Sequence, residues 1–90
     1  MSSLAAAVAV PEVAGATKFS VQAGAEPGVM PRVLELFAKR GLVPERWNSC
    51  VVRAARLTID IEIAGLDRDT AEYVANCMRQ IVGVDLVLTA

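Results

Sequence analysis

The most restrictive feature of this sequence is the strict alternation of apolar and polar side chains over residues 56–63, RLTIDIEI. Leu57 and three isoleucines occupy every second position, and Thr58, Asp60 and Glu62 lie between them. Because successive side chains of a strand point to opposite faces, the pattern predicts a strand with one face on a core and one in water. An antiparallel sheet covered on one side only meets that requirement.

A second alternating segment, residues 17–24, predicts another half-buried strand. Its apolar side chains are Phe19, Val21 and Ala23, and its polar ones are Lys18, Ser20 and Gln22. The two segments therefore fit as strands of one sheet that share a buried face and a wet face.

Residues 29–40 follow with helical spacing of their apolar side chains, at Val29, Val33, Leu34 and Phe37. Pro31 is tolerated only in the first turn of a helix, so the helix begins close to it. Gly41 is a natural terminator.

A second apolar stripe at helical spacing runs from Ala71 to Val82, and Gly83 is expected to end this helix. Either Asp67 or Asp69 can cap its first turn. If Asp69 is the cap, Glu72 lies three residues later, which gives a pattern similar to a capping box with Asp in place of Ser.

Two less regular segments, residues 42–52 and 84–88, complete the set of predicted strands. Pro44 cannot donate to a strand ladder, so residues 42–52 are expected at a sheet edge, and residues 53–55 form the turn that follows. The order β-α-β-β-α-β predicts an α+β, ferredoxin-like βαββαβ fold, a four-stranded antiparallel sheet with two helices on one face.

The length of 90 residues indicates one domain, expected over residues 17–90 after a poorly ordered leader at residues 1–16. A domain of this size buries only about 60% of the surface of its unfolded chain. Hydrophobic residues make up 54% of the sequence and aromatic residues only 4%. This excess of aliphatic side chains predicts a partner, most simply a second copy of the chain.

Composition also excludes several functions. The net charge is −1 with no basic patch, which argues against nucleic acid as a partner. The chain has no histidine, and Cys50 and Cys77 are far apart, so no metal site or cofactor is expected. Both thiols are predicted to be buried and reduced, and one disulfide between them is the alternative. No apolar run approaches the ~20 residues of a membrane span, and no Lys or Arg precedes the apolar start as in a signal peptide, so a cytoplasmic protein is expected.

Other proteins with this fold need residues that the chain lacks. An RNA-recognition module needs aromatic side chains on the open sheet face, where this chain has only polar and acidic ones. A copper chaperone needs paired thiols before the first helix, and an acylphosphatase-like enzyme needs an arginine in an anion loop there, but Glu26 occupies that loop. No activated nucleophile or ligand cluster is apparent, so the chain is not expected to be an enzyme.

The segment at residues 26–42, EPGVMPRVLELFAKRGL, combines an acidic loop, a Pro-Gly turn, the pairs RV and LF, and a basic pair before glycine. It resembles the first turn and helix of the ACT domain family and is most similar to the small regulatory subunit of acetolactate synthase. Residues 43–48 continue in that register, and residues 78–87, MRQIVGVDLV, resemble the end of that subunit. The resemblance extends over residues 18–88.

The resemblance implies a non-catalytic regulator of an enzyme of branched-chain amino-acid biosynthesis, with an amino-acid effector bound between paired protomers. The implied effector-binding residues are Ala25, Glu26, Gly28, Val29 and Met30. Effector-binding members carry asparagine where this chain has Ala25, and Pro31 removes one amide donor, so feedback by an effector is expected to be lost, as in an insensitive regulatory subunit. A plain turn at Gly28 with a solvated Glu26 remains the alternative for this loop.

Pairing is expected through the strand at residues 42–52, with Trp47 and Asn48 at the interface. Trp47 fits equally well as a cover for the edge of the core. Three functions therefore remain open: a regulatory subunit bound to a large catalytic subunit, a free-standing homodimeric amino-acid sensor, and a structural adaptor without a ligand.

Overall fold

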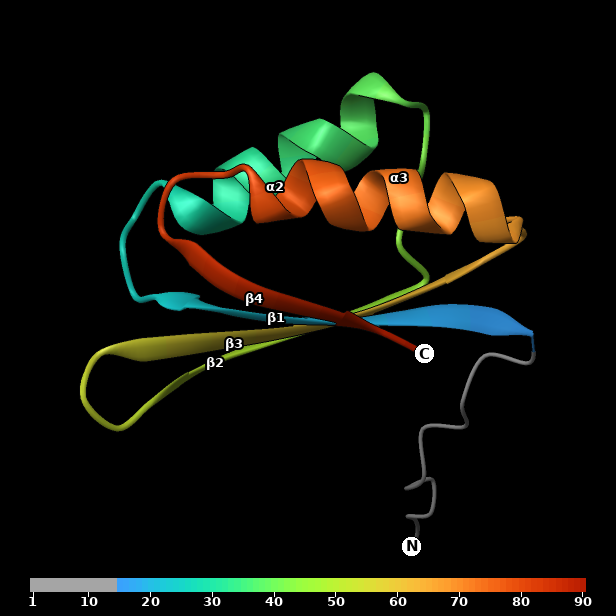
Figure 1. Ribbon diagram of the computed structural model, residues 1–90. Coiled ribbons are helices and arrows are strands. Elements are labelled where there is room, and N and C mark those ends of the chain that lie inside the picture. The colour runs from blue at the N-terminus through green and yellow to red at the C-terminus, as the bar shows by residue number, and fades with distance from the viewer. Residues whose placement is uncertain (1–14) are drawn as a thin grey trace, which may run out of the picture.

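The computed structural model describes residues 15–90, which form a four-stranded sheet with two helices lying across one face (Figure 1). The elements in chain order are β1 (Ala16–Gly24), α2 (Val29–Lys39), β2 (Arg46–Val52), β3 (Arg56–Ala64), α3 (Arg68–Arg79) and β4 (Val84–Thr89). The predicted βαββαβ fold is therefore confirmed. The expected leader at residues 1–16 lies outside the described residues except at its end, where Ala16 already belongs to β1.

The strands are antiparallel in the order β2-β3-β1-β4, so the two alternating segments are the central strands and β2 and β4 are the edges. In the β1–β3 register Phe19 lies opposite Ile61 and Val21 opposite Ile59. Lys18 lies opposite Glu62 on the other face. The helices therefore cover one face, as the alternation predicts.

The core lies between this covered face and the apolar stripes of the helices. Val33 and Phe37 of α2 and Val74 and Met78 of α3 are buried against it. Phe37 meets Phe19 of β1 edge to face, with ring centroids 6.2 Å apart and an interplanar angle of 88°. This arrangement favours contact between the positive edge of one ring and the negative face of the other.

Both helices begin close to the expected residues, but the caps and the end of α3 differ from the prediction. Asp67 is the N-cap of α3 and accepts a hydrogen bond from the amide of Thr70, so the alternative box of Asp69 and Glu72 is wrong. α3 ends at Arg79, because the chain turns sharply before Gly83, whose φ is +99°.

β2 is shorter than predicted, since residues 42–45 are not part of the strand. Pro44 lies in the connection before it, where no ladder amide is required. The edge position is confirmed.

The two cysteines are free, but the prediction that both are buried is wrong, since Cys50 is exposed and Cys77 only half-buried. Cys50 is exposed because β2 is an edge strand, and Cys50 lies opposite Thr58 on the face without helices. Cys77 is half-buried on α3.

Candidate functional site

Three connections that are far apart in the sequence meet at one end of the sheet, called here the loop end: residues 24–29, 53–56 and 80–85 (Figure 1). The amide of Ala25 donates to the carbonyl of Ala55 at 2.8 Å. The amide of Gly24 donates to the carbonyl of Gly83 at 3.0 Å. Backbone hydrogen bonds thus tie the predicted effector loop to both other connections.

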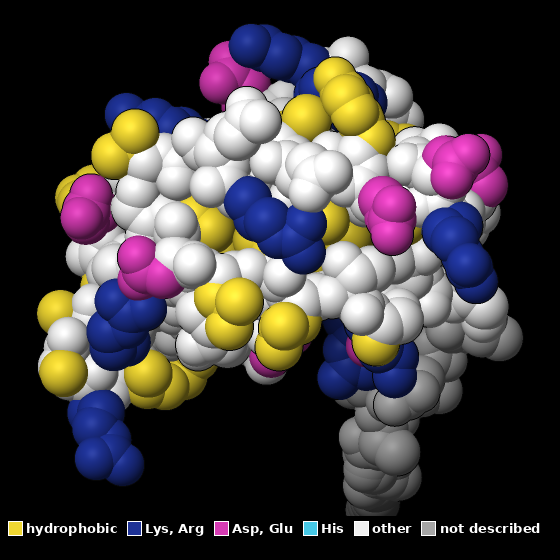
Figure 2. Space-filling view, in the orientation of Figure 1, with side chains coloured by type: hydrophobic (Ala, Val, Ile, Leu, Met, Phe, Trp, Pro, Cys, Tyr) yellow, Lys and Arg dark blue, Asp and Glu magenta, His cyan; other side chains and the backbone are white. Residues whose placement is uncertain are grey.

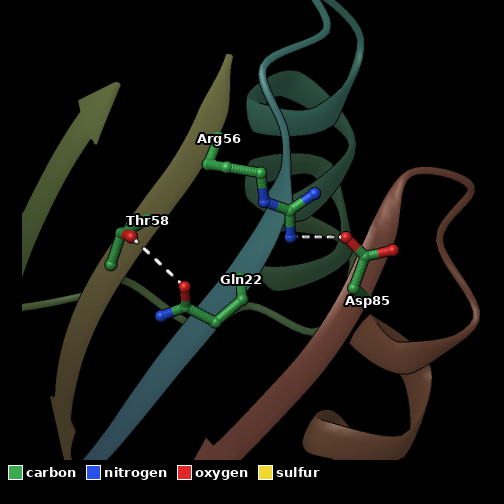
Figure 3. Close-up of polar contacts among 4 residues, drawn as sticks. All are labelled: Gln22, Arg56, Thr58 and Asp85. Carbon is green, nitrogen blue, oxygen red and sulfur yellow. Dashed lines mark hydrogen bonds and ion pairs between the residues drawn. The ribbon is translucent and has the colours of Figure 1, made fainter. Parts of the chain in front are cut away.

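An ion pair on the open sheet face holds the same end together. Arg56 of β3 reaches Asp85 of β4 at 2.6 Å, passing over β1 where Gly24 has no side chain (Figure 3). Gln22 accepts a hydrogen bond from the hydroxyl of Thr58 at 3.4 Å in the next row of the sheet (Figure 3). These side chains bridge β3, β1 and β4 beneath the loop end.

The amides of the predicted effector loop differ from the expectation at one position. Val29 is one of the implied effector-binding residues, but its N–H is already engaged, because it donates to the carbonyl of Glu26 at 3.1 Å. The amide of Arg32 donates to Gly28, and Pro31 has none. Since the first amides of a helix lack partners within it, Met30 remains as the first-turn donor for an anion.

Arg32, in the first turn of α2, lies next to this loop and is not among the residues expected from the sequence. A β-carbon at Gly28 would overlap Nη1 of Arg32, so its guanidinium lies directly over this glycine. Arg32 is exposed and makes no ion pair with any of residues 15–90. Its position one turn into α2, after a glycine, is the signal that could have pointed to it.

Glu26 supplies the opposite charge. Its carboxylate folds back over the loop end, where a β-carbon on Gly24 would lie 3.4 Å from Oε2 and one on Gly83 would lie 3.6 Å from Oε1. Glu26 and Arg32 thus lie on the two sides of the Pro27-Gly28 turn. One loop thereby presents an acceptor for an ammonium group and a donor for a carboxylate.

The neighbouring turn contains two alanines in the left-handed region. Ala54 and Ala55 have φ values of +59° and +56°, and the amide of Arg56 closes the turn on the carbonyl of Arg53 at 3.3 Å. Two successive positive φ values are typical of a type I′ hairpin, in which glycine and asparagine are preferred. Strain of this kind is often found at functional sites.

The predicted interface residues lie on β2, away from the loop residues in sequence but on the exposed edge of the sheet. Trp47 lies opposite Ile61, is half-buried and packs against the core. Asn48 lies opposite Asp60 and is exposed on the open face. The two residues therefore point to different faces of the same edge strand.

Hollows are also present elsewhere on the surface of residues 15–90. One of about 670 Å³ runs between α3 and β4. A smaller one of about 270 Å³ lies near the end of β4, lined by residues of β1, β3 and β4. Within residues 15–90 no cluster of acidic or cysteine side chains is placed to hold a metal ion, and no helix has the length and apolarity to cross a bilayer.

The face of the molecule in Figure 2 shows acidic and basic side chains intermixed, with apolar ones between them. A nucleic-acid-binding face would instead gather lysine and arginine into one patch or stripe.

The fold is shared with solved ACT domains. The chain is similar to the ACT domain of GTP pyrophosphokinase from Chlorobium tepidum, with a TM-score of 0.72, 12% identity, and coverage of 83% of this chain and 96% of that chain. It is also similar to the regulatory subunit of aspartate kinase from Thermus flavus, with a TM-score of 0.63, 15% identity, and coverage of 83% and 50%.

A homoserine dehydrogenase from Thiobacillus denitrificans contains a similar domain, with a TM-score of 0.66, 13% identity, and coverage of 83% of this chain and 16% of that chain. At these identities the likeness concerns the fold alone. A comparison with curated proteins found no significant match.

The sequence itself matches the family described as ACT-like domain over residues 12–89. These comparisons support the family that the sequence resembles, without singling out the regulatory subunit of acetolactate synthase. By this match, which spans most of its length, the chain belongs to the ACT-like domain family.

Proposed function

We propose that this chain is a non-catalytic regulatory domain that pairs through β2 and binds a small amino acid at the loop end. The observation that carries the proposal is a pair of opposite charges at the loop end, the Arg32 guanidinium over Gly28 and the Glu26 carboxylate beside Gly24 and Gly83. Arg32 lies over Gly28 without an ion pair among residues 15–90, and Glu26 folds back on the other side of the turn.

An α-amino acid presents a carboxylate and an ammonium group about one carbon apart, and the loop offers a partner for each. The Arg32 guanidinium and the amide of Met30 are donors for the carboxylate, which the N-terminal end of α2 also favours electrostatically. Glu26 is the acceptor for the ammonium group. Ala25, which stands where effector-binding members carry asparagine, leaves Glu26 and Arg32 as the main polar side chains of the loop.

Pairing is supported by the surface that β2 leaves uncovered. Val51 faces the same side of the sheet as its neighbour Leu57, yet Val51 is 62% exposed whereas Leu57 is 1% exposed. The helices therefore do not extend over the end of this edge strand. Cover from a second copy would bury Val51 and place Trp47 beside the new interface.

The regulated enzyme is the finer part of the proposal. Solved proteins with this fold include a regulatory subunit of aspartate kinase and a homoserine dehydrogenase. Residues 26–42 most resemble the small subunit of acetolactate synthase, so the large subunit of such an enzyme is the proposed partner. A free-standing sensor of amino acids and an adaptor without ligand remain the alternatives.

Thermal unfolding with a panel of amino acids, the branched-chain ones included, tests the binding claim. An effector at a hundredfold excess over its Kd is expected to stabilise the protein by ~2.7 kcal/mol. Arg32→Ala is expected to abolish the response, whereas Arg68→Ala, which removes an exposed arginine from the first turn of the other helix, retains it.

A flat response to every amino acid would contradict the sensor claim. In that case mixing the chain with an acetolactate synthase large subunit separates the remaining functions. Co-elution with a change in activity supports a subunit whose feedback is lost. The absence of both co-elution and a change in activity supports the adaptor.

A further inference from the structure

The second edge of the sheet, β4, differs from β2 in how its backbone is disposed. Lys18 of β1 and Ala90 exchange both of their backbone hydrogen bonds, at 3.0 and 2.8 Å. Because hydrogen-bonded pairs alternate with non-bonded pairs in an antiparallel ladder, Ser20 and Leu88 form the next bonded pair. The amide and carbonyl of Val87 and Thr89 therefore point outward from the sheet.

The outward carbonyl of Val87 is occupied by a side chain. Nη2 of Arg79 donates to it at 2.7 Å, and Nη1 of the same guanidinium donates to Oδ1 of Asn76 at 2.6 Å. Arg79 is the last residue of α3, so the helix itself holds this arginine against the middle of the edge. A strand arriving at β4 would have to displace a charged and doubly bonded group.

The start of β4 has a second obstacle. The register between β1 and β4 shifts at Gln22 and Ala23, and this irregularity leaves Asp85 without a partner on β1. Asp85 is instead paired with Arg56 at 2.6 Å (Figure 3). Bulges and charges are devices by which proteins keep edge strands from pairing with other chains.

Exposed apolar side chains are present on both edges, since Val51 and Val52 of β2 are 62% and 45% exposed and Leu86 and Leu88 of β4 are 47% and 56% exposed. Such side chains favour association of an edge strand with another chain. What distinguishes β4 is the guanidinium of Arg79 on its outward carbonyl and the irregular start at Asp85.

We propose that Arg79 closes the β4 edge against a second copy of this chain, so that assembly stops at the pair joined through β2. A protein with one available edge forms a closed two-fold pair, whereas two available edges allow chains to add without end. The role of Arg79 does not depend on the proposed pairing through β2. Only the expected size of the closed assembly, two chains, depends on that pairing.

Sedimentation of the intact chain over a range of concentrations tests the role of Arg79. Arg79→Met keeps an aliphatic stem over the edge but removes the guanidinium, and Arg79→Ala removes both. Both variants are expected to form species heavier than the wild type, increasingly so with concentration. Arg68→Ala, which removes an arginine from the same hollow between α3 and β4, is the matched control and is expected to sediment as the wild type.

Circular dichroism establishes that each variant is folded before its mass is compared. If folded Arg79→Met and Arg79→Ala match the wild type in mass at every concentration, the proposal is overturned. A wild type that sediments as a single chain would contradict the pairing through β2, but heavier Arg79 variants would still support closure of β4. The closure of β4 by Arg79 and the pairing through β2 can therefore be contradicted independently of each other.

Discussion

At the scale of single residues, Ala54 and Ala55 adopt a backbone conformation that asparagine and glycine reach at lower cost. For an L-residue the left-handed region costs roughly 1–2 kcal/mol. The hydrogen bond from the Ala25 amide to the Ala55 carbonyl, at 2.8 Å, fixes this turn against the predicted effector loop. Strain in the hairpin is thus located beside the site where binding is proposed.

Replacing the two alanines by the preferred residues of a type I′ turn, Ala54→Asn with Ala55→Gly, is expected to stabilise the protein by about 1 kcal/mol. In a domain of this size the gain raises Tm by about 4–8 °C. Ala38→Gly, at an exposed position within α2, is the control and should lower stability by about 1 kcal/mol. An unchanged or lower Tm in the turn variant would show that the turn is not strained.

At the scale of elements, the start of α3 depends on a carboxylate cap whose charge can be titrated. The amide of Thr70 donates to Asp67 at 2.7 Å, and this hydrogen bond lowers the pKa of Asp67 from its ordinary value of 3.8. A carboxyl group whose pKa is lower in the folded protein than in the unfolded chain stabilises the fold, and this contribution is fully present at pH values above the pKa of the unfolded chain. That contribution is lost as the pH falls through the folded pKa.

Asp67→Asn keeps a capping oxygen but removes the charge, so it separates the two effects. The wild type is expected to exceed this variant in Tm near neutral pH, and the difference should shrink as the pH falls below about 4. Asp69→Asn removes a charge from the same turn without touching the cap, and is the control. A difference that stays constant across the acid range would contradict the assignment of Asp67.

The elements that could be predicted best are those with the strongest periodicity. The two central strands were predicted almost to the residue, because one face of each is buried and the alternation is strict. The beginning of β2 and the end of α3 were placed wrongly. Residues 42–43 and 81–82 are apolar and so extend the neighbouring pattern, but turns determined by the tertiary structure interrupt the strand and the helix there.

At the scale of the whole molecule, the candidate site could be predicted only in part. Glu26 and Gly28 follow from a local motif, whereas the role of Arg32 depends on its side chain folding back over Gly28. The contacts with Ala55 and Gly83 join segments that are distant in sequence. No local pattern encodes such contacts, because they form only when the chain folds.

The aliphatic excess of the sequence is also explained at this scale. The buried side chains form one core between the sheet and the helices, and further apolar side chains remain exposed along β2 and β4. Since we propose that Arg79 and Asp85 close the second of these edges, β2 is left as the proposed surface for a partner. A pair of chains joined at β2 is therefore expected.

The most direct test is the mass in solution of the wild type and of Val51→Lys. The wild type is expected at the mass of two 9.5-kDa chains, and Val51→Lys at the mass of one, because a lysine on this edge opposes strand pairing. Val82→Lys places the same change at a valine outside β2 that is 77% exposed, against 62% for Val51, and this variant should remain paired. A wild type that is a single chain at all concentrations, or a Val51→Lys variant that stays paired, would contradict the account.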